Sequence, residues 1–338
     1  MDVLVLGGSV FVGRAVVDEA LALGADVTVF NRGTSGPRRD GTTHIIGDRT
    51  VAEDLEQLRG RHFDLVVDTC GYVPAEVALS ANLLADSSHH YGFVSSINAY
   101  PGWPTEPDYR VGGVHDGDPD ATRADVPEGL SAAQDYGWLK VGCERAVERA
   151  FGASRCAILR AGSIVGPHDS QVGRLPWWVA RVARGGEILV PGRPGDPVAP
   201  IDSRDLAQFA LGAAPGTFEA TGPSDRDTRA DLMAGCLAAT GAEATLTYIE
   251  DEDWLTEQGV GYWTELPLWI PASIGPGVFA HHSAEAEAAG LRWRPLADTI
   301  ADTWAWMCST PGAHEPAQSA TRLAPEREDA LLASWKTR

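Results

Sequence analysis

The sequence predicts an α/β fold, a doubly wound parallel sheet with a smaller C-terminal substrate lobe. The chain opens with an apolar run at residues 3–6 that stops at a glycine pair. Further runs that are apolar throughout recur up to residue 160, with stretches of helical character between them. Strands that are apolar at every position, rather than at every second one, indicate a parallel sheet that helices cover on both faces.

The first 33 residues carry the most information. After the apolar run come Gly7, Gly8 and then Gly13, which opens a predicted helix at residues 14–23, before a second strand at 27–30. Strand, glycine turn, helix and strand form the βαβ unit of a Rossmann-type fold that binds dinucleotides. The glycines allow a tight turn, and they let a diphosphate approach backbone N–H groups at the helix N-terminus.

The remaining predicted elements set the domain boundaries. Further strands are expected at 44–46, 63–69, 91–95, 156–160 and 217–220, and helices at 51–58, 75–86, 132–150 and 202–212. A polar insertion at 101–129 is expected to lie near the site as a loop. Residues 1–166, joined by 201–220, therefore form the predicted dinucleotide-binding domain. Residues 167–200 and 221–308 form a substrate lobe, and 309–338 form a linker with a helix from 325 that Leu331, Leu332 and Trp335 dock.

Composition limits the classes of partner. The net charge of the 338-residue chain is −20, which disfavours nucleic acids and anionic membranes. No apolar run is long enough to span a membrane, and a first strand at residue 2 or 3 leaves no room for a signal peptide. Five cysteines without a C-x-x-C spacing indicate reduced thiols in a cytoplasmic protein. The histidines, His281 included, lack metal-ligand spacing, so we expect no metal and place them at the surface.

Tyr136 and Lys140 are the first candidates for chemistry. Residues four apart share a helix face, and a nearby ammonium lowers the pKa of a phenol, which makes a usable acid/base. A plain surface pair is the alternative, but Lys140 is one of only two lysines in the chain. At the end of a predicted strand, the Ser96 hydroxyl could hydrogen-bond a substrate oxygen, whereas Ser95 has turn capping as a stronger alternative.

With these three stretches, the chain resembles the extended short-chain dehydrogenase/reductase family, which includes sugar-nucleotide epimerases, over roughly residues 1–220. The resemblance implies that Tyr136 is the acid/base and that Ser96 positions the substrate oxygen. It also implies that Lys140 tunes Tyr136 and contacts the cofactor ribose. The implied cofactor-binding residues are Gly7, Gly8, Ser9, Phe11, Val12, Gly13, Asn31, Arg32, Asp48 and Lys140.

Several positions depart from the family pattern. Val10 stands where a middle glycine is expected, with Gly8 as the available substitute, and the supporting asparagine has no clear match. Ile97 and Asn98 replace the Asp-Glu of the family's dehydratases, which disfavours dehydration. The GGxxFxG form resembles an atypical subgroup in which some members are similar to RNA-binding proteins, a role that the negative charge argues against.

The end of the second strand indicates the cofactor. A carboxylate there selects NAD, whereas an arginine accommodates the 2′-phosphate of NADP. This chain has Asn31 and Arg32, with Arg38 and Arg39 close behind, so NADP(H) is favoured and NAD(H) stays open. Asp48 resembles the family's adenine contact, with a helix cap as the alternative.

The substrate is less well specified. Tyr100, Trp103, Trp177, Trp178 and Trp263 are candidates for an apolar wall, although core packing is the commoner use of tryptophan in such a lobe. Arg181 or Arg193 are candidates to hold an anionic group. The resemblance leaves a homodimer through the helices at 75–86 and 132–150 open.

The sequence thus predicts an NADP(H)-dependent oxidoreductase that transfers a hydride at a carbonyl or alcohol carbon of a small-molecule or sugar-like substrate. An NAD-dependent sugar-nucleotide epimerase is the first alternative, because both reactions use the same residues. A non-catalytic dinucleotide sensor or scaffold, motivated by Val10, is the second.

Overall fold

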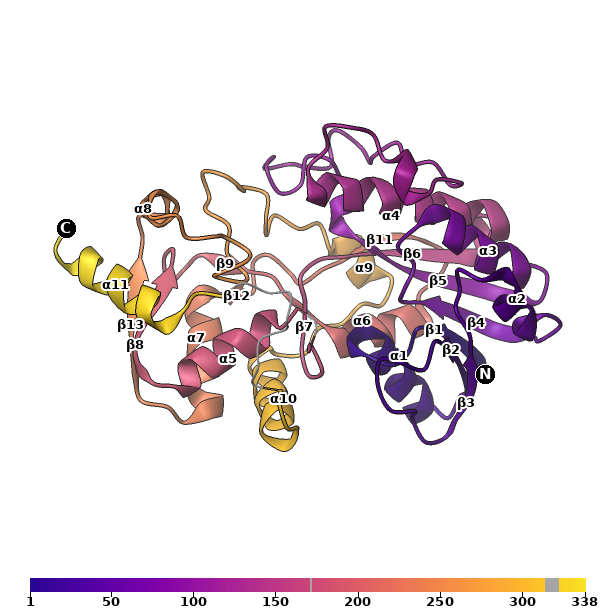
Figure 1. Cartoon of the computed structure of the whole chain (residues 1–338), viewed down its shortest axis with the longest axis horizontal. Helices are drawn as coiled ribbons and strands as arrows, with labels where there is room; N and C mark the ends of the chain where they lie inside the picture. The colour runs from indigo at the N-terminus through magenta and orange to yellow at the C-terminus, as the bar shows by residue number, and fades with distance from the viewer. Residues whose placement is uncertain (171, 314–321) are drawn as a thin grey trace.

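The computed structural model describes residues 1–170, 172–313 and 322–338. Seven parallel strands form the central sheet in the order β11-β6-β5-β4-β1-β2-β3 (Figure 1). They are β1 (Asp2–Leu6), β2 (Asp26–Asn31), β3 (Thr42–Ile46), β4 (Phe63–Asp68), β5 (Ser88–Ser96), β6 (Cys156–Ala161) and β11 (Gly216–Ala220). The predicted doubly wound parallel sheet is confirmed.

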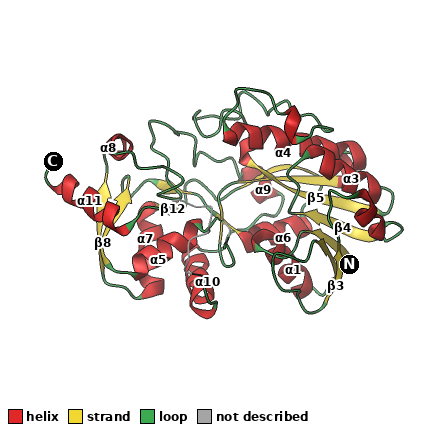
Figure 2. Cartoon of the chain, viewed as in Figure 1, coloured by secondary structure: helices red, strands yellow, loops and turns green. Residues whose placement is uncertain are grey.

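Helices cover both faces of this sheet (Figure 2). On one face lie α1 (Phe11–Ala22) and α6 (Ser203–Gly212), and on the other α3 (Pro74–Leu84) and α4 (Ala132–Phe151). Alternate residues of β1 point into the two separate cores, with Val3 in the first and Leu4 in the second. This two-sided burial explains why the strands are apolar at every position.

The first helix begins earlier than predicted. It starts at Phe11 rather than after Gly13, because Arg14 N already donates to Val10 O at 3.2 Å. Gly13 therefore lies inside the first turn. A Cβ there would lie 2.6 Å from the backbone nitrogen of Gly8, so glycine is required for this close approach.

The shorter elements of the sheet half connect strands to helices. They are α2 (Ala52–Leu55) and four 3₁₀ helices, η1 (Glu56–Leu58), η2 (Ile97–Ala99), η3 (Arg123–Asp125) and η4 (Ala153–Arg155). The polar insertion after η2 is anchored by the buried Tyr109, whose hydroxyl donates to Glu219 Oε2 at 2.8 Å.

The C-terminal part has a core of its own, at the left of Figure 1. Trp178 and Trp269 are its largest fully buried side chains, so Trp178 serves the core rather than a substrate wall. Its strands are β7 (Ile164–Val165), β8 (Gly186–Pro191), β9 (Pro197–Val198), β10 (Ile201–Asp202), β12 (Asp227–Thr228) and β13 (Ala244–Ile249). Its helices are α5 (Arg174–Ala183), α7 (Arg229–Thr240), α8 (Glu252–Glu257), α10 (Leu296–Ser309) and α11 (Pro325–Lys336). In contrast, α9 (Ala284–Ala288) packs beside β11, with Ala286 in the core of the sheet half (Figure 1).

The predicted docking of the last helix is confirmed. Leu331 and Leu332 of α11 are buried, and the rings of Trp335 and Trp254 lie 5.1 Å apart. Part of the predicted linker, residues 314–321, lies outside the described residues.

Two expectations on reactive side chains have different outcomes. The five cysteines are all free thiols, as predicted. The surface position predicted for His281 is wrong, because its side chain is 8% exposed and packs with Nδ1 3.3 Å from the hydroxyl of Tyr109. Within the described residues, no helix combines the length and the apolarity that a membrane span needs.

Candidate functional site

A cavity of about 460 Å³ lies at the carboxyl ends of β1 and β4. β2 flanks β1 on one side and β4 flanks it on the other, so the connections leave the two strands in opposite directions. Such a switch point opens a crevice, which is where open α/β sheets bind ligands. Gly7 and Gly8 line the cavity from β1, and Thr69 and Cys70 line it from β4.

The glycine loop accommodates Val10 without strain. Gly7 and Gly8 have φ angles of 107° and 83°, which favour glycine. Val10 has φ −135° and ψ 151°, an extended conformation that any residue adopts. The positive φ falls instead on Phe11, at 41°. Non-glycine residues in this region cost about 1–3 kcal/mol and cluster at ligand sites.

The start of α1 suits a phosphate group. No side chain caps this helix, and Arg14 is the first residue whose amide bonds back to the loop. The amides of Phe11, Val12 and Gly13 thus have no acceptor within the helix, and all three residues line the cavity. Free amides at a helix N-terminus are a general anion site, so this cradle fits a diphosphate.

Asn31 is engaged by its own chain. Its Nδ2 donates to Gly7 O at 2.7 Å and to Ser9 Oγ at 2.8 Å, and its Oδ1 accepts from Gly33 N at 2.9 Å. The side chain lines the cavity, and it holds the glycine loop against the end of β2.

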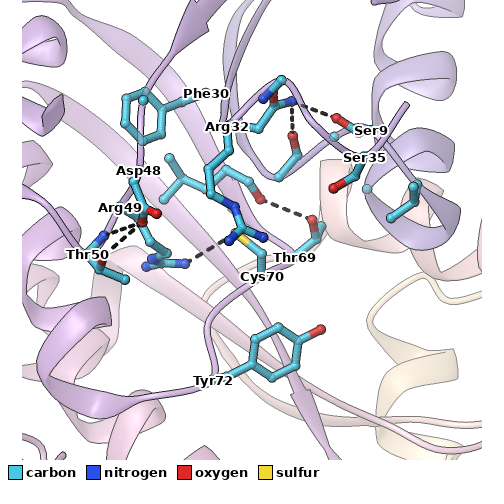
Figure 3. A pocket seen from close by; sticks show the side chains of 18 of the residues that line it. Ser9, Phe30, Arg32, Ser35, Asp48, Arg49, Thr50, Thr69, Cys70 and Tyr72 are labelled. Carbon is cyan, nitrogen blue, oxygen red and sulfur yellow. Dashed lines mark hydrogen bonds between the residues drawn. The ribbon is translucent and has the colours of Figure 1, made fainter. Parts of the chain in front are cut away.

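Arg32 and Asp48 point into the same cavity (Figure 3). Asp48 accepts from the amide and hydroxyl of Thr50, which lowers the pKa of its carboxyl, and the Arg32 charge lowers it further. This is a local turn rather than a cap of α2, whose cap position is Val51. The alternative prediction, that Asp48 caps a helix, is therefore wrong.

The two other basic residues after β2 are not part of the cavity lining. Arg39 pairs with Asp18 of α1, and Arg38 acts on His44 instead. Of the predicted cofactor-binding residues, those that line the cavity are Gly7, Gly8, Ser9, Phe11, Val12, Gly13, Asn31, Arg32 and Asp48. Lys140 does not line it.

A buried ion pair beneath the cavity escaped the sequence analysis. Arg49 Nη1 donates to Asp68 Oδ1 at 2.8 Å, and Arg49 Nη2 donates to Ser80 Oγ at 2.7 Å. Tyr91 donates its hydroxyl to the other oxygen of Asp68 at 2.9 Å. The network joins the segment after β3, the end of β4, α3 and the middle of β5, which are far apart in sequence, so no local spacing signals it. Cys70 and Tyr72 also line the cavity, and they could have been predicted because they directly follow β4.

Ser96 and Tyr136 come together, from the end of β5 and the first turn of α4. Burial raises the pKa of Tyr136, and a hydrogen bond between Tyr136 and Ser96 lowers it by a smaller amount. Ser96 Oγ also donates to Asn98 Oδ1 at 3.0 Å and accepts from Asn98 N, so it caps η2. Turn capping, predicted as the alternative role for Ser95, thus occurs at Ser96.

The predicted effect of Lys140 on Tyr136 is wrong for this structure. Lys140 Nζ is buried and donates to Gly71 O at 2.8 Å and to Val94 O at 2.7 Å. It lies 4.1 Å from the ring centroid of Phe93. The ammonium therefore ties the ends of β4 and β5 together and does not lower the Tyr136 pKa, which burial raises.

A second cavity, of about 470 Å³, lies in the lobe, where Arg193, Asp196 and the buried Arg229 are among its lining residues. Arg181 is buried in an ion pair with Glu328, its other two nitrogens each donate to a backbone carbonyl, and it lines neither cavity. Its predicted role in anion binding is wrong. The described residues contain no cluster of three side chains that could hold a metal ion.

Similarity to known proteins agrees with this geometry. Residues 3–91 match the model of a family described as the NAD dependent epimerase/dehydratase family. The resemblance predicted from the sequence is confirmed. No curated protein sequence matches this chain.

Solved structures share the fold over nearly the whole chain. One is a UDP-glucose 4-epimerase from Thermotoga maritima with UDP-glucose, at a TM-score of 0.64 and 17% identity over 91% of this chain and 99% of that one. A Thermus thermophilus UDP-glucose 4-epimerase in complex with NAD has a TM-score of 0.60 and 18% identity, over 92% of this chain and 100% of that one. The Bordetella bronchiseptica enzyme WbmH in complex with NAD+ has a TM-score of 0.62 and 16% identity, over 91% of this chain and 98% of that one.

Proposed function

We propose that this protein is an NADP(H)-dependent oxidoreductase of the extended short-chain dehydrogenase/reductase type. The observation that carries the proposal is the pairing of a dinucleotide-sized cavity at the switch point with Ser96 and Tyr136 in contact at the end of β5. The family match over residues 3–91 and the shared fold support the enzyme class. Residues 167–200 and 221–308 supply the substrate lobe in this proposal.

The residues have separate roles. The nicotinamide ring, when bound, supplies or accepts the hydride. Tyr136 gives a proton from its hydroxyl to the substrate oxygen in reduction, and Ser96 holds that oxygen by a hydrogen bond. Lys140 is a positioning residue in this structure, because it fixes the carbonyls of Gly71 and Val94.

The raised pKa of Tyr136 favours the reductive direction. Burial keeps the phenol protonated through neutral pH, where it is ready to donate. Reduction should therefore hold its rate from pH 6 to pH 9 and fall only above the raised pKa, whereas alcohol oxidation should rise with pH. Initial rates in both directions against pH test this sign.

Replacing Tyr136 tests the function directly. Tyr136→Phe removes the proton donor and should lower kcat about 10²–10⁴-fold with NADPH affinity unchanged. The exposed Tyr262→Phe is the matched control and should keep full turnover. Turnover of Tyr136→Phe within a factor of three of the unaltered protein would remove Tyr136 from the mechanism.

A second candidate is an NAD-dependent epimerase that acts through a transient ketone. The similarity in fold to UDP-glucose 4-epimerases, one of them in complex with NAD, favours it. Denaturing the purified protein and analysing the released nucleotide separates the two. Tightly retained NAD indicates the epimerase, whereas exchangeable NADPH indicates the reductase.

A further inference from the structure

Arg174 lies next to the proposed acid/base, and Arg322 lies close to Arg174. Arg174 is the first residue of α5, and its charge acts on Tyr136 of α4. Arg322, which precedes α11, lies close enough for its charge and that of Arg174 to oppose each other. The lobe thus brings one positive charge to Tyr136 and a second positive charge close to the first.

Arg174 and Arg322 share one carboxylate in the described part of the chain, because the charge of Asp169 acts on both of them. No ion pair links Arg174 or Arg322 to a carboxylate in the ranges 1–170, 172–313 and 322–338. Arg322 donates to the backbone carbonyls of Thr264 and Val172. Arg174 Nε is buried and has no hydrogen-bond partner among the described residues. Burying a charge without a partner is costly, so this arrangement has an unfilled requirement for an anion.

The single charge of Asp169 meets only part of that requirement, because it is set against two guanidiniums. Asp169 is buried, and its two oxygens accept the backbone N–H groups of Val172 at 3.1 Å and Arg174 at 3.2 Å. Arg160, by contrast, has a carboxylate of its own and donates to both oxygens of Glu144. One carboxylate against two guanidiniums leaves an excess of positive charge near Tyr136, in a protein whose net charge is −20.

Aromatic rings complete the surroundings of Arg174. Its guanidinium carbon lies 5.3 Å from the ring centroid of Trp263, and Trp263 meets Trp103 edge-on at 6.1 Å. Trp103 comes from the insertion after η2, so both halves of the molecule contribute. A guanidinium beside an indole is held in place and keeps its in-plane donors free for a planar or tetrahedral anion.

We propose that Arg174, assisted by Arg322, binds an anionic group of the substrate, a carboxylate or a phosphate, and so selects anionic carbonyl or alcohol compounds over neutral ones. The inference rests on the proposed function only in calling the ligand a substrate. The anion site itself follows from two guanidiniums that share one buried carboxylate among the described residues.

Small dianions test the site without knowledge of the whole substrate. Malonate, inorganic phosphate and the neutral isostere malonamide are titrated into the full-length protein, with the tryptophan fluorescence next to Arg174 as the readout. Malonate or phosphate should bind at least about tenfold more tightly than malonamide, because charge-assisted hydrogen bonds are the stronger kind. The better of the two anions distinguishes a carboxylate substrate from a phosphorylated one.

Variants locate the binding. Arg174→Gln should weaken anion binding at least about tenfold, and Arg322→Gln should weaken it less, because Arg322 already donates to two carbonyls. Arg59→Gln removes an equal charge from an exposed pair with Glu56 and should leave anion binding unchanged. If Arg174→Gln does not fold, Arg322→Gln and the malonamide comparison decide.

Three results overturn the proposal: equal binding of malonate and malonamide, no loss in either site variant, or an equal loss in Arg59→Gln. NADPH titration of the same samples keeps the two proposals apart. Anion binding without NADPH binding leaves the anion site standing and removes the proposed oxidoreductase. NADPH binding without anion binding removes the anion site and leaves the proposed oxidoreductase standing.

Discussion

The sheet half and the C-terminal lobe each bury an arginine against a carboxylate, but they use the pair differently. In the sheet half, Arg49 pairs with Asp68 and lines the first cavity. In the lobe, Arg181 pairs with Glu328 and joins α5 to α11, and neither residue lines either of the two cavities described above. The role of a buried ion pair therefore follows from the surface next to it and cannot be inferred from the residue types.

Neutralising the two carboxylates should separate stability from binding. Asp68→Asn and Glu328→Gln each leave a buried guanidinium unpaired, which should lower the free energy of unfolding by about 3–5 kcal/mol. Only Asp68→Asn should also weaken NADPH binding, since Arg49 lines the cavity. Urea denaturation and NADPH titration measure the two effects. Equal losses of NADPH affinity in both variants would remove the contrast.

Helical glycines give the next largest contrast. A Cβ at Gly137 of α4 would lie 1.9 Å from the backbone oxygen of Asn98, whereas one at Gly235 of α7 would meet only Cδ1 of the Ile300 side chain, at 2.5 Å. Gly137→Ala should lower the free energy of unfolding by about 2–3 kcal/mol, because the backbone cannot rotate away. Gly235→Ala should stay within about 1 kcal/mol of the parent, because the helix preference for alanine offsets a side-chain shift. Thermal unfolding compares them.

His281 tests the junction between the two regions, where the insertion meets β11 and the segment before α9. Burial lowers the pKa of His281 to about 3, and the charge of His282 adds to this. In the unfolded chain His281 takes up its proton at about pH 6.5. The stability that the neutral His281 contributes is therefore complete above that pH and falls as the pH drops toward 3. The slope from this group is about 1.4 kcal/mol per pH unit.

His281→Gln should flatten this part of the acid dependence, measured as the free energy of unfolding at pH 7 and pH 5. The exposed His89→Gln serves as the control and should keep the parent slope. An unchanged slope in His281→Gln would show that His281 is not the group that the acid titrates.

The smallest expected effect concerns one arginine from each cavity. Arg32→Gln should weaken NADPH binding about tenfold and leave NADH binding unchanged, because the guanidinium is expected to meet the 2′-phosphate. Arg193→Gln, at the second cavity, should change neither affinity. A loss of NADH affinity in Arg32→Gln would contradict selection at the 2′ position.

Much of the dinucleotide cavity could be predicted because its residues are close in sequence. Gly7 to Gly13 and Asn31 to Arg32 fall within one βαβ unit, whose local pattern fixes where each residue stands. Arg49 could not be predicted in the same way, since Asp68 and Tyr91 reach it only through the pairing of separate strands. Spacing also placed Lys140 on the helix face of Tyr136, but it could not show that Gly71 and Val94 take up its ammonium.

The sequence by itself determined the parallel sheet, the glycine loop and the docking of α11, because hydrophobic periodicity and glycine positions are local properties. Only the tertiary structure decided which charged side chains are paired. It placed Arg181 in an ion pair with Glu328, whereas Nε of Arg174, beside Tyr136, has no hydrogen-bond partner among the described residues. Both residues belong to one helix and have the same charge, and what separates them is the long-range packing that brings Glu328 to one and Tyr136 to the other.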